Sequence, residues 1–209
     1  MADTAARRGR PGYDRDALLR VAVQVFTERG YDGTSMEDLA ARLGITKSSI
    51  YHHVPGKAEL LRLAVGRALD ALTAVTEEAA ATSGPAIDRL EHVVRRSVDV
   101  LAAELPFVTL LLRVRGNTEV EQAALARRRQ FDRIVSDLVA RAAAEGDLRP
   151  GVDPALTSRL LFGTVNSLTE WYRPDGGLAP GDLADAVVAT IFTGIRVDRA
   201  PRVRSIPPG

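Results

Sequence analysis

The stretch of residues 34–57, TSMEDLAARLGITKSSIYHHVPGK, constrains the fold of this chain more than any other. Thr34 and Glu37 have the spacing of a capping box, in which the Thr hydroxyl accepts the Glu backbone N–H and the Glu carboxylate reaches back. We therefore expect a helix to begin near Ser35. Gly44 can take the left-handed conformation that ends a helix. Between these signals lie apolar residues at helical spacing: Met36, Leu39, Ala40 and Leu43.

A second short helix is expected directly after the glycine, because Thr46 is a suitable N-cap. On a helical wheel Ile50 lies opposite a polar arc made of Lys47, Ser48, Tyr51 and His52. Such side chains can donate hydrogen bonds to base edges or to phosphate oxygens. The alternative is a solvated face of a small helical bundle. The two-helix spacing with a glycine turn favours a helix-turn-helix that binds DNA.

Residues 41–61, ARLGITKSSIYHHVPGKAELL, and the amphipathic segment before them resemble the DNA-binding region of the TetR family of transcriptional regulators. The resemblance is strong over residues 14–65 and weaker elsewhere. Two positions depart from the family pattern. Val54 stands where many members have an aromatic residue, and Gly56 stands where they have a Ser or Asn cap. Val54 should still pack, and Gly in place of a better N-cap costs only a few tenths of a kcal/mol.

The resemblance also implies which side chains contact DNA. Positions that read base edges in this family are occupied here by Lys47, Ser48, Ser49 and His52. Positions that grip phosphates are occupied by Ser35, Tyr51, His53 and Lys57. Thr46, at the start of the second helix, completes the set of expected DNA contacts.

The rest of the chain also reads as helix, so we expect an all-α fold of about nine helices. Asp14 and Gly30 bound a first helix, Thr118 and Glu121 form another capping box, and Asp153 precedes a helix that begins with Pro. The further helices are expected near residues 57–81, 86–103 and 182–195, with a shorter apolar segment at 106–117. The expected organisation is a flexible basic arm (1–13), a three-helix helix-turn-helix domain (14–56), a larger ligand-binding and dimerisation domain (57–196) and a flexible tail (197–209).

The last two helices predict a homodimer, because they carry more apolar surface than a small domain can easily cover. Their apolar residues are Leu156, Leu160, Gly163, Leu168 and Trp171 on one, and Leu183, Ala186, Val187, Ile191 and Ile195 on the other. The TetR resemblance implies that these two helices pair with their mates in a four-helix bundle. The alternative is burial inside the monomer. A two-fold dimer would bind a palindromic operator of double-stranded DNA.

A small-molecule effector is implied by the same resemblance, with its pocket among the middle helices. The stretch LLFGTVNSLTEWYRPDGGL is similar to a subset of the family that responds to acyl-coenzyme A, and arginines on neighbouring segments suit its phosphates. We therefore expect release from DNA by a fatty or aromatic acyl-coenzyme A. The alternative is that the aromatic residues form the core and the arginines a solvated face. The candidate ligand-binding residues are Phe107, Arg113, Phe131, Asn166, Trp171 and Tyr172.

Composition excludes several other classes of protein. The formal net charge is only +1, so DNA-binding charge must be local, as in the expected arm with Arg7, Arg8 and Arg10. The chain has no Cys, which removes disulfides and thiolate metal sites and fits the cytoplasm. No apolar run suits a membrane span or a signal peptide. The adjacent His52 and His53 cannot chelate one metal ion from a helix, and no nucleophile elbow or nucleotide-binding glycine pattern is present.

We therefore expect a ligand-responsive DNA-binding regulator, a repressor, with no catalytic residues, metal or cofactor. One alternative is a helical dimer that binds a small molecule and has lost specific DNA binding. Another is an activator with the same DNA-binding helices. The retained Lys47, Tyr51 and Lys57 argue against the loss of DNA binding.

Overall fold

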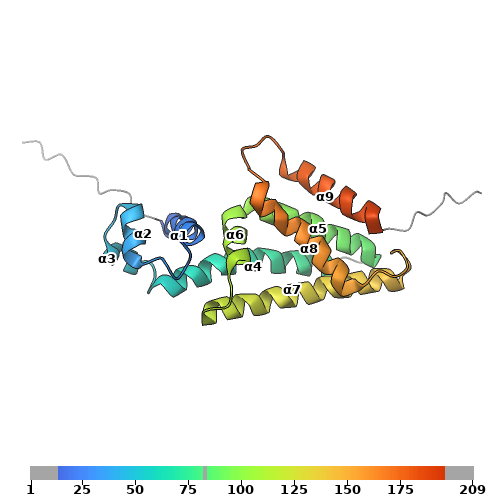
Figure 1. The fold of residues 1–209 in the computed structure, drawn as a ribbon, viewed down its shortest axis with the longest axis horizontal. Coiled ribbons are helices and arrows are strands. Elements are labelled where there is room, and N and C mark those ends of the chain that lie inside the picture. The colour runs from blue at the N-terminus through green and yellow to red at the C-terminus, as the bar shows by residue number, and fades with distance from the viewer. Residues whose placement is uncertain (1–13, 82–83, 196–209) are drawn as a thin grey trace, which may run out of the picture. The chain divides into compact units, whose positions relative to one another are not determined.

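The computed structural model describes residues 14–81 and 84–195, and the predicted arm and tail lie outside these residues. The described residues form nine helices and no β-strand, which confirms the all-α fold (Figure 1). None of these helices is both long enough and apolar enough to cross a bilayer. The helices are α1 (Arg15–Arg29), α2 (Met36–Leu43), α3 (Lys47–Tyr51), α4 (Lys57–Ala81), α5 (Ala86–Ala103), α6 (Leu105–Arg113), α7 (Glu119–Ala144), α8 (Pro154–Trp171) and α9 (Pro180–Ile195).

The chain divides into two compact units. Of the described residues, unit 1 holds 14–67 together with 106–124, and unit 2 holds 68–81, 84–105 and 125–195. The three points where the chain passes from one unit to the other lie within α4, near the start of α6 and within α7. The domain limits expected from the sequence, 14–56 and 57–196, stay a prediction.

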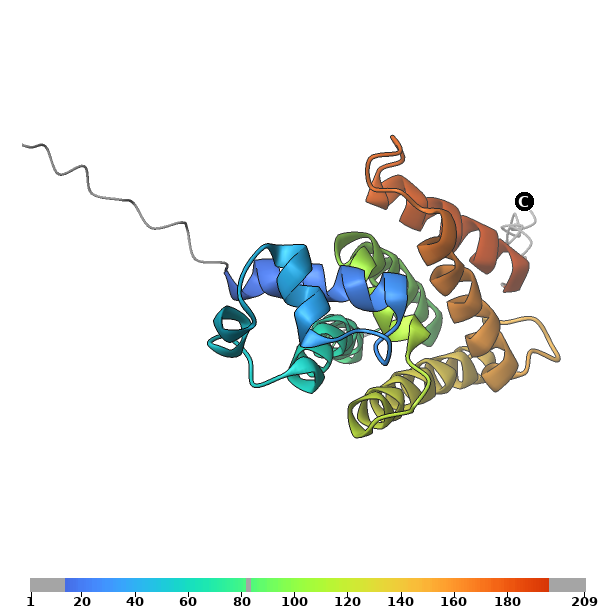
Figure 2. The same cartoon turned by 60° about the vertical axis from the view of Figure 1, so that its left-hand side comes forward.

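In unit 1, α2 contacts both α1 and α3 (Figures 1 and 2). Asp14 caps α1 by accepting the Asp16 backbone N–H at 3.3 Å, and Gly30 ends the helix with φ of 81°. Large apolar side chains of four helices fill the core at 0–2% exposure: Leu18, Phe26, Leu39, Ile50, Leu60 and Leu61. Burial of each such side chain stabilises the unit by about 1.5–3 kcal/mol. The short α3 is therefore held by one deep anchor, Ile50, as its sequence predicts.

Unit 2 is a helical assembly in which α5 contacts both α8 and α9 (Figures 1 and 2). Asp153 caps α8 by accepting the Leu156 backbone N–H at 2.6 Å, and Pro154 opens the helix, as predicted. Helix α9 begins at Pro180, two residues before the predicted start. Its Leu183, Val187 and Phe192 are buried within the single chain.

Candidate nucleic-acid interface

The start of α2 is set by Ser35 and Asp38, which corrects the predicted capping box of Thr34 and Glu37. The Asp38 N–H donates to Ser35 Oγ at 3.1 Å, and the Ser35 N–H donates to Asp38 Oδ2 at 2.8 Å. Thr34 is buried, and its hydroxyl donates to the Gly30 carbonyl at 2.7 Å. Because that bond ties Thr34 to the end of α1, the neighbouring serine is left to cap α2.

The turn between α2 and α3 has the geometry that the sequence predicts. Gly44 lies in the left-handed region at φ of 65°, and its N–H bonds to the carbonyls that end α2. The Ile45 N–H then donates to the Ala40 carbonyl at 3.1 Å. Thr46 caps α3 by accepting the Ser49 N–H at 3.2 Å, and the two hydroxyl oxygens lie 2.8 Å apart. These contacts fix the direction of a helix that is too short to be stable alone.

The polar side of α3 is open to solvent. Lys47, Ser48, His52 and His53 are exposed, and Tyr51 is 46% exposed although it is a large aromatic residue. Ile50 on the opposite side is fully buried. Lys47, Ser48 and Tyr51 lie on α3, and His52 and His53 follow its last residue. Exposed side chains of these types can contact phosphates and base edges together.

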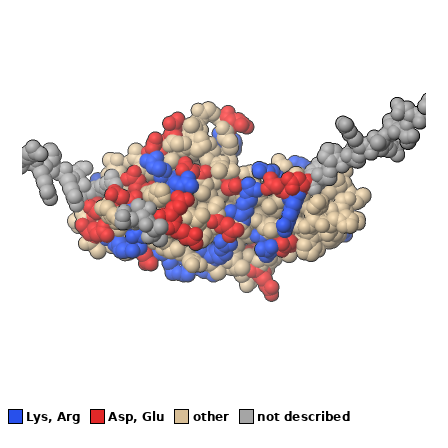
Figure 3. All heavy atoms as spheres, turned by 180° about the vertical axis from the view of Figure 1, so that it is seen from behind, with Lys and Arg blue, Asp and Glu red and all other residues tan. Residues whose placement is uncertain are grey.

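Lys47 is the first residue of α3, and it pairs with the Glu37 carboxylate of α2. The Glu37 hydrogen bond raises the pKa of Lys47, and the same bond lowers the pKa of Glu37. The Lys47 ammonium also lies 6.0 Å from the centre of the Tyr51 ring. Lys and Arg are interspersed with Asp and Glu on the molecular face drawn in Figure 3. A DNA phosphate would therefore compete with a carboxylate for Lys47.

The family resemblance places Lys57 and Ser35 on phosphates, but both side chains already form hydrogen bonds within unit 1. Lys57 Nζ donates to the carbonyls of Tyr31 and Thr34, each at 2.8 Å, and lies 4.3 Å from the Tyr31 ring centre. Ser35 Oγ bonds to the Asp38 carboxylate at 2.6 Å. Lys57 thus joins the first turn of α4 to the loop between α1 and α2. A direct phosphate contact by either side chain stays a prediction.

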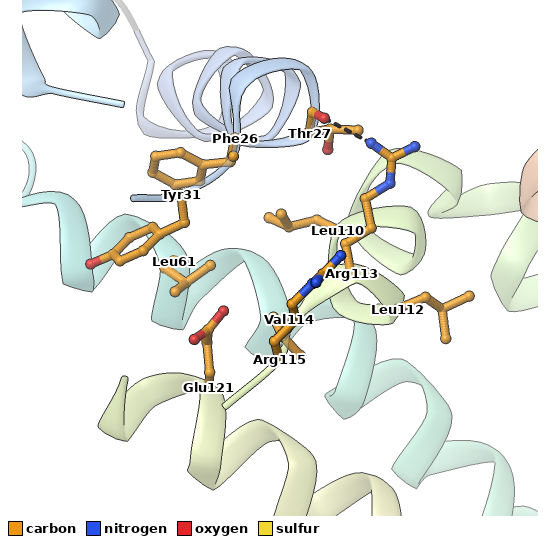
Figure 4. Close-up of a pocket in the computed structure, with 11 residues that line it drawn as sticks. Phe26, Thr27, Tyr31, Leu61, Leu110, Leu112, Arg113, Val114, Arg115 and Glu121 are labelled. Atoms are coloured by element: carbon orange, nitrogen blue, oxygen red, sulfur yellow. Dashed lines mark hydrogen bonds between the residues drawn. The ribbon is translucent and has the colours of Figure 1, made fainter. Parts of the chain in front are cut away.

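A cavity of about 520 Å³ opens within unit 1, among α1, α4, α6 and the start of α7 (Figure 4). Arg113 Nη1 donates to the Thr27 carbonyl at 2.7 Å across it. Burial raises the pKa of Tyr31, and the Asp32 and Glu121 carboxylates add to the rise. The cavity is lined by Phe26, Thr27, Gly30, Tyr31, Leu61, Leu110, Leu112, Arg113, Val114, Arg115 and Glu121.

The six candidate ligand-binding residues are divided between the two units, and Arg113 is the one that lines this cavity. Phe107 is buried in unit 1, where the Arg67 guanidinium lies 4.4 Å from its ring centre. Phe131 of unit 2 packs edge-on against Phe162, with 5.0 Å between ring centres. The other three lie in unit 2 with different surroundings: Asn166 is half-buried, Trp171 is exposed and Tyr172 is buried. Their role in ligand binding stays a prediction.

Sequence reasoning missed Tyr31, Thr27 and Glu121 as cavity residues. Glu121 was recognised as a cap, and it does cap α7 by accepting the Thr118 N–H at 3.1 Å. Nothing local in the sequence indicates that the same carboxylate also lines a cavity. Among the described residues, no group of three or more His, Asp or Glu is placed to hold a metal ion.

Helix α8 exposes apolar side chains that the single chain does not cover. Leu156, Leu160 and Trp171 are 56%, 64% and 54% exposed, and Gly163 between them is exposed as well. Leu168, which was predicted to share this surface, is instead buried in the core of unit 2.

Comparison with known proteins extends over both ends of the chain. Residues 18–64 match the family described as bacterial regulatory proteins, tetR family, and residues 83–195 match the tetracyclin repressor-like C-terminal domain. A crystal structure of a TetR-family regulator from Streptomyces coelicolor A3 is 55% identical, with a TM-score of 0.81, over 93% of this chain and 99% of that one.

Two further relatives carry functional names. The HTH-type transcriptional repressor KstR2 of Mycolicibacterium smegmatis is 25% identical over 195 residues, which is 88% of this chain and 92% of that protein. The crystal structure of AibR in complex with isovaleryl coenzyme A and operator DNA is 27% identical, with a TM-score of 0.72, over 85% of this chain and 97% of that one. Both matches cover more than four fifths of this chain.

Proposed function

The chain belongs to the TetR family of DNA-binding transcriptional regulators, and from that premise we propose that it is a dimeric repressor of a palindromic operator, released by a small-molecule effector. The observation that carries the proposal is the surface of α3. Its exposed Lys47, Ser48 and His52 stand opposite the buried Ile50, on a helix fixed by caps at both of its neighbouring turns. A rigid, exposed polar helix face is what reading base edges in a major groove requires.

The contacts divide into two kinds that experiment can separate. Lys47, Ser48, Ser49 and His52 are proposed to read base edges, with Ser35, Tyr51, His53 and Lys57 on phosphates and Thr46 at the helix start. Removing a base contact relaxes the sequence preference at one operator position and reduces the binding free energy by about 1–3 kcal/mol. Removing a phosphate contact weakens binding to all sequences alike. The variants S48A and Y51F provide one example of each kind.

The test is to select bound sequences from random DNA and then measure binding of the selected site by fluorescence anisotropy. We expect a palindrome and a steep loss of affinity as salt concentration rises, because phosphate contacts release counterions. S48A should change the preferred sequence, and Y51F should lower affinity for selected and scrambled DNA equally. Selection that yields no enriched sequence would favour the alternative of a helical dimer without specific DNA binding.

The proposed dimer uses α8 and α9 of two chains. Support comes from the exposed Leu156, Leu160 and Trp171 on α8, because isolated chains rarely leave large apolar side chains this exposed on one helix. Gly163 lies between them and would let a partner helix approach closely. A two-fold axis would set two copies of α3 one helical turn of DNA apart, about 34–36 Å.

The proposed effector is a fatty or aromatic acyl-coenzyme A. AibR, whose crystal structure contains isovaleryl coenzyme A and operator DNA, supports this class of ligand. Isovaleryl-, phenylacetyl- and decanoyl-coenzyme A should each be titrated into the protein–operator complex, with free coenzyme A as control. We expect at least one thioester to release the DNA. Tighter DNA binding with a thioester would keep this ligand class but refute release, and no effect would refute the class.

A further inference from the structure

The cavity of unit 1 is distinct from the candidate ligand residues of unit 2, and all eleven of its lining residues belong to unit 1. Its volume of about 520 Å³ falls within the range of small-molecule sites, about 300–1,000 Å³. Apolar side chains from three helices and the segment after α6 form much of its wall (Figure 4): Phe26, Leu61, Leu110 and Val114.

The polar groups of the cavity favour an anion at one end. Arg113 uses Nη1 on the Thr27 carbonyl, which leaves its other guanidinium N–H groups for a ligand. Arg115 is exposed and makes no hydrogen bond or ion pair with any described residue. Thr27 Oγ1 is buried and lacks a hydrogen-bond partner among the described residues. Two arginines on one cavity wall, with the Arg113 guanidinium bonded to the residue that carries this unpaired hydroxyl, can supply the donors that a carboxylate needs.

Glu121 restricts the ligand to one anionic group. It is 6% exposed, and in Figure 4 it projects from the start of α7 toward Leu61 and Tyr31, whereas Arg113 extends toward Thr27. A second anionic group near Glu121 would be repelled by its carboxylate. We propose that this cavity binds an amphiphilic monocarboxylate, with its carboxylate on Arg113 and Arg115 and its chain over the apolar wall.

A ligand in the cavity would affect the DNA-binding helices through the contacts of Tyr31. Tyr31 lines the cavity, and Lys57 lies over its ring while donating to the carbonyls of Tyr31 and Thr34. The next residue, Ser35, is the N-cap of α2. A chain that displaces the Tyr31 ring therefore loosens the loop from which α2 begins. This step rests on the proposed function, and it predicts weaker operator binding when the cavity is occupied.

The binding test uses decanoate as the probe and the full-length protein without DNA, by isothermal titration calorimetry below the micelle concentration of decanoate. Decanol tests whether the charge matters, and decyl phosphate tests whether a phosphate serves equally well. R115Q is the informative variant, because Arg115 is exposed and has no hydrogen bond or ion pair with a described residue that the change would remove. R129Q changes an exposed arginine outside the cavity and is the matched control.

We expect decanoate to bind once per chain and R115Q to weaken binding about tenfold, the loss of one charge-assisted pair. R129Q should bind like the parent. E121Q should bind more tightly, since Gln keeps the capping acceptor but removes the repelling charge. Equal binding by R115Q, equal binding of decanol, or tighter binding of decyl phosphate would each overturn the assignment to a monocarboxylate.

A second arm measures operator affinity with and without decanoate. We expect decanoate to weaken operator binding by the parent and to have much less effect on R115Q. Decanoate that binds without changing operator affinity would overturn the route through Tyr31. If the protein bound no DNA at all, the proposed function would be wrong. The calorimetry would still test whether the cavity binds decanoate.

Discussion

Replacing Lys57 by Met separates a structural lysine from a DNA-binding one. The lysine ammonium donates to the carbonyls of Tyr31 and Thr34 at 2.8 Å and lies 4.3 Å from the Tyr31 ring centre. Methionine keeps an unbranched chain of similar length and helix propensity but removes the charge and all three N–H donors. The change therefore acts on the loop between α1 and α2 and leaves the packing of α4 in place.

The expected loss of stability follows from these contacts. Two hydrogen bonds from a charged donor contribute roughly 3 kcal/mol together. The ammonium over an aromatic ring adds about 0.5 kcal/mol at a partly exposed site. Ordering a lysine side chain costs about 1.5–2 kcal/mol, which the variant recovers. We therefore expect Lys57→Met to lower the free energy of unfolding by about 2 kcal/mol.

The assay is urea unfolding followed by far-UV circular dichroism, with hydrogen exchange of the α2 amides to locate the change. Lys47→Met is the matched control on the same surface. Its ion pair with Glu37 joins side chains that are 45% and 64% exposed, and exposed pairs contribute little to stability. We expect Lys47→Met to unfold at nearly the same urea concentration as the parent while weakening operator binding.

The two variants should thus differ in stability. Lys57→Met should unfold at lower urea concentration than the parent and show faster exchange at the start of α2, whether or not Lys57 also contacts a phosphate. If it instead kept the parent's stability, the reasoning from its two backbone hydrogen bonds would be wrong.

Three further outcomes are expected. Hydrogen bonds from Ser35, and then the charge of Arg29, hold the pKa of Asp38 below its ordinary value of 3.8, so its stabilisation is present above that value and is lost as pH falls through the lower folded pKa. Urea unfolding at a series of acidic pH values should therefore show that the free energy of unfolding falls less steeply with pH for Asp38→Asn than for the parent. Gly44→Ala places a side chain at φ of 65° and should cost about 1 kcal/mol in the same assay. Leu160→Glu should convert the proposed dimer to monomer in light scattering, and a parent that is itself monomeric would contradict the dimer.

The order and type of the helices could be predicted from the sequence because caps, glycines and apolar spacing are local signals. The choice between two overlapping caps could not. Thr34 and Ser35 each precede an acidic residue three positions later, so the pattern allows both. The decision depends on the Gly30 carbonyl, which accepts the Thr34 hydroxyl only once α1 has ended and the chain has turned back.

The polar surface of α3 could be predicted because one helix carries it, but the cavity could not because four separate segments line it. Choosing ligand residues by aromatic type failed to distinguish Trp171 from Tyr172, which are adjacent yet 54% and 2% exposed. Their difference arises from the end of α8 between them, where the chain leaves the helical direction. Exposure at such a boundary depends on tertiary packing rather than on residue type.

The interleaving of the two units in the chain limits how this protein can be recombined with its relatives. A chimera that exchanges only the segment up to residue 67 would keep the host's residues 106–124, which complete unit 1. Arg113 and Thr27, or Arg67 and Phe107, would then come from different parents. A functional exchange of operator specificity should therefore either stay within α2 and α3 or carry both segments together. Gene fusions with a single crossover inside α4 should often yield folded helices with a poorly formed unit 1.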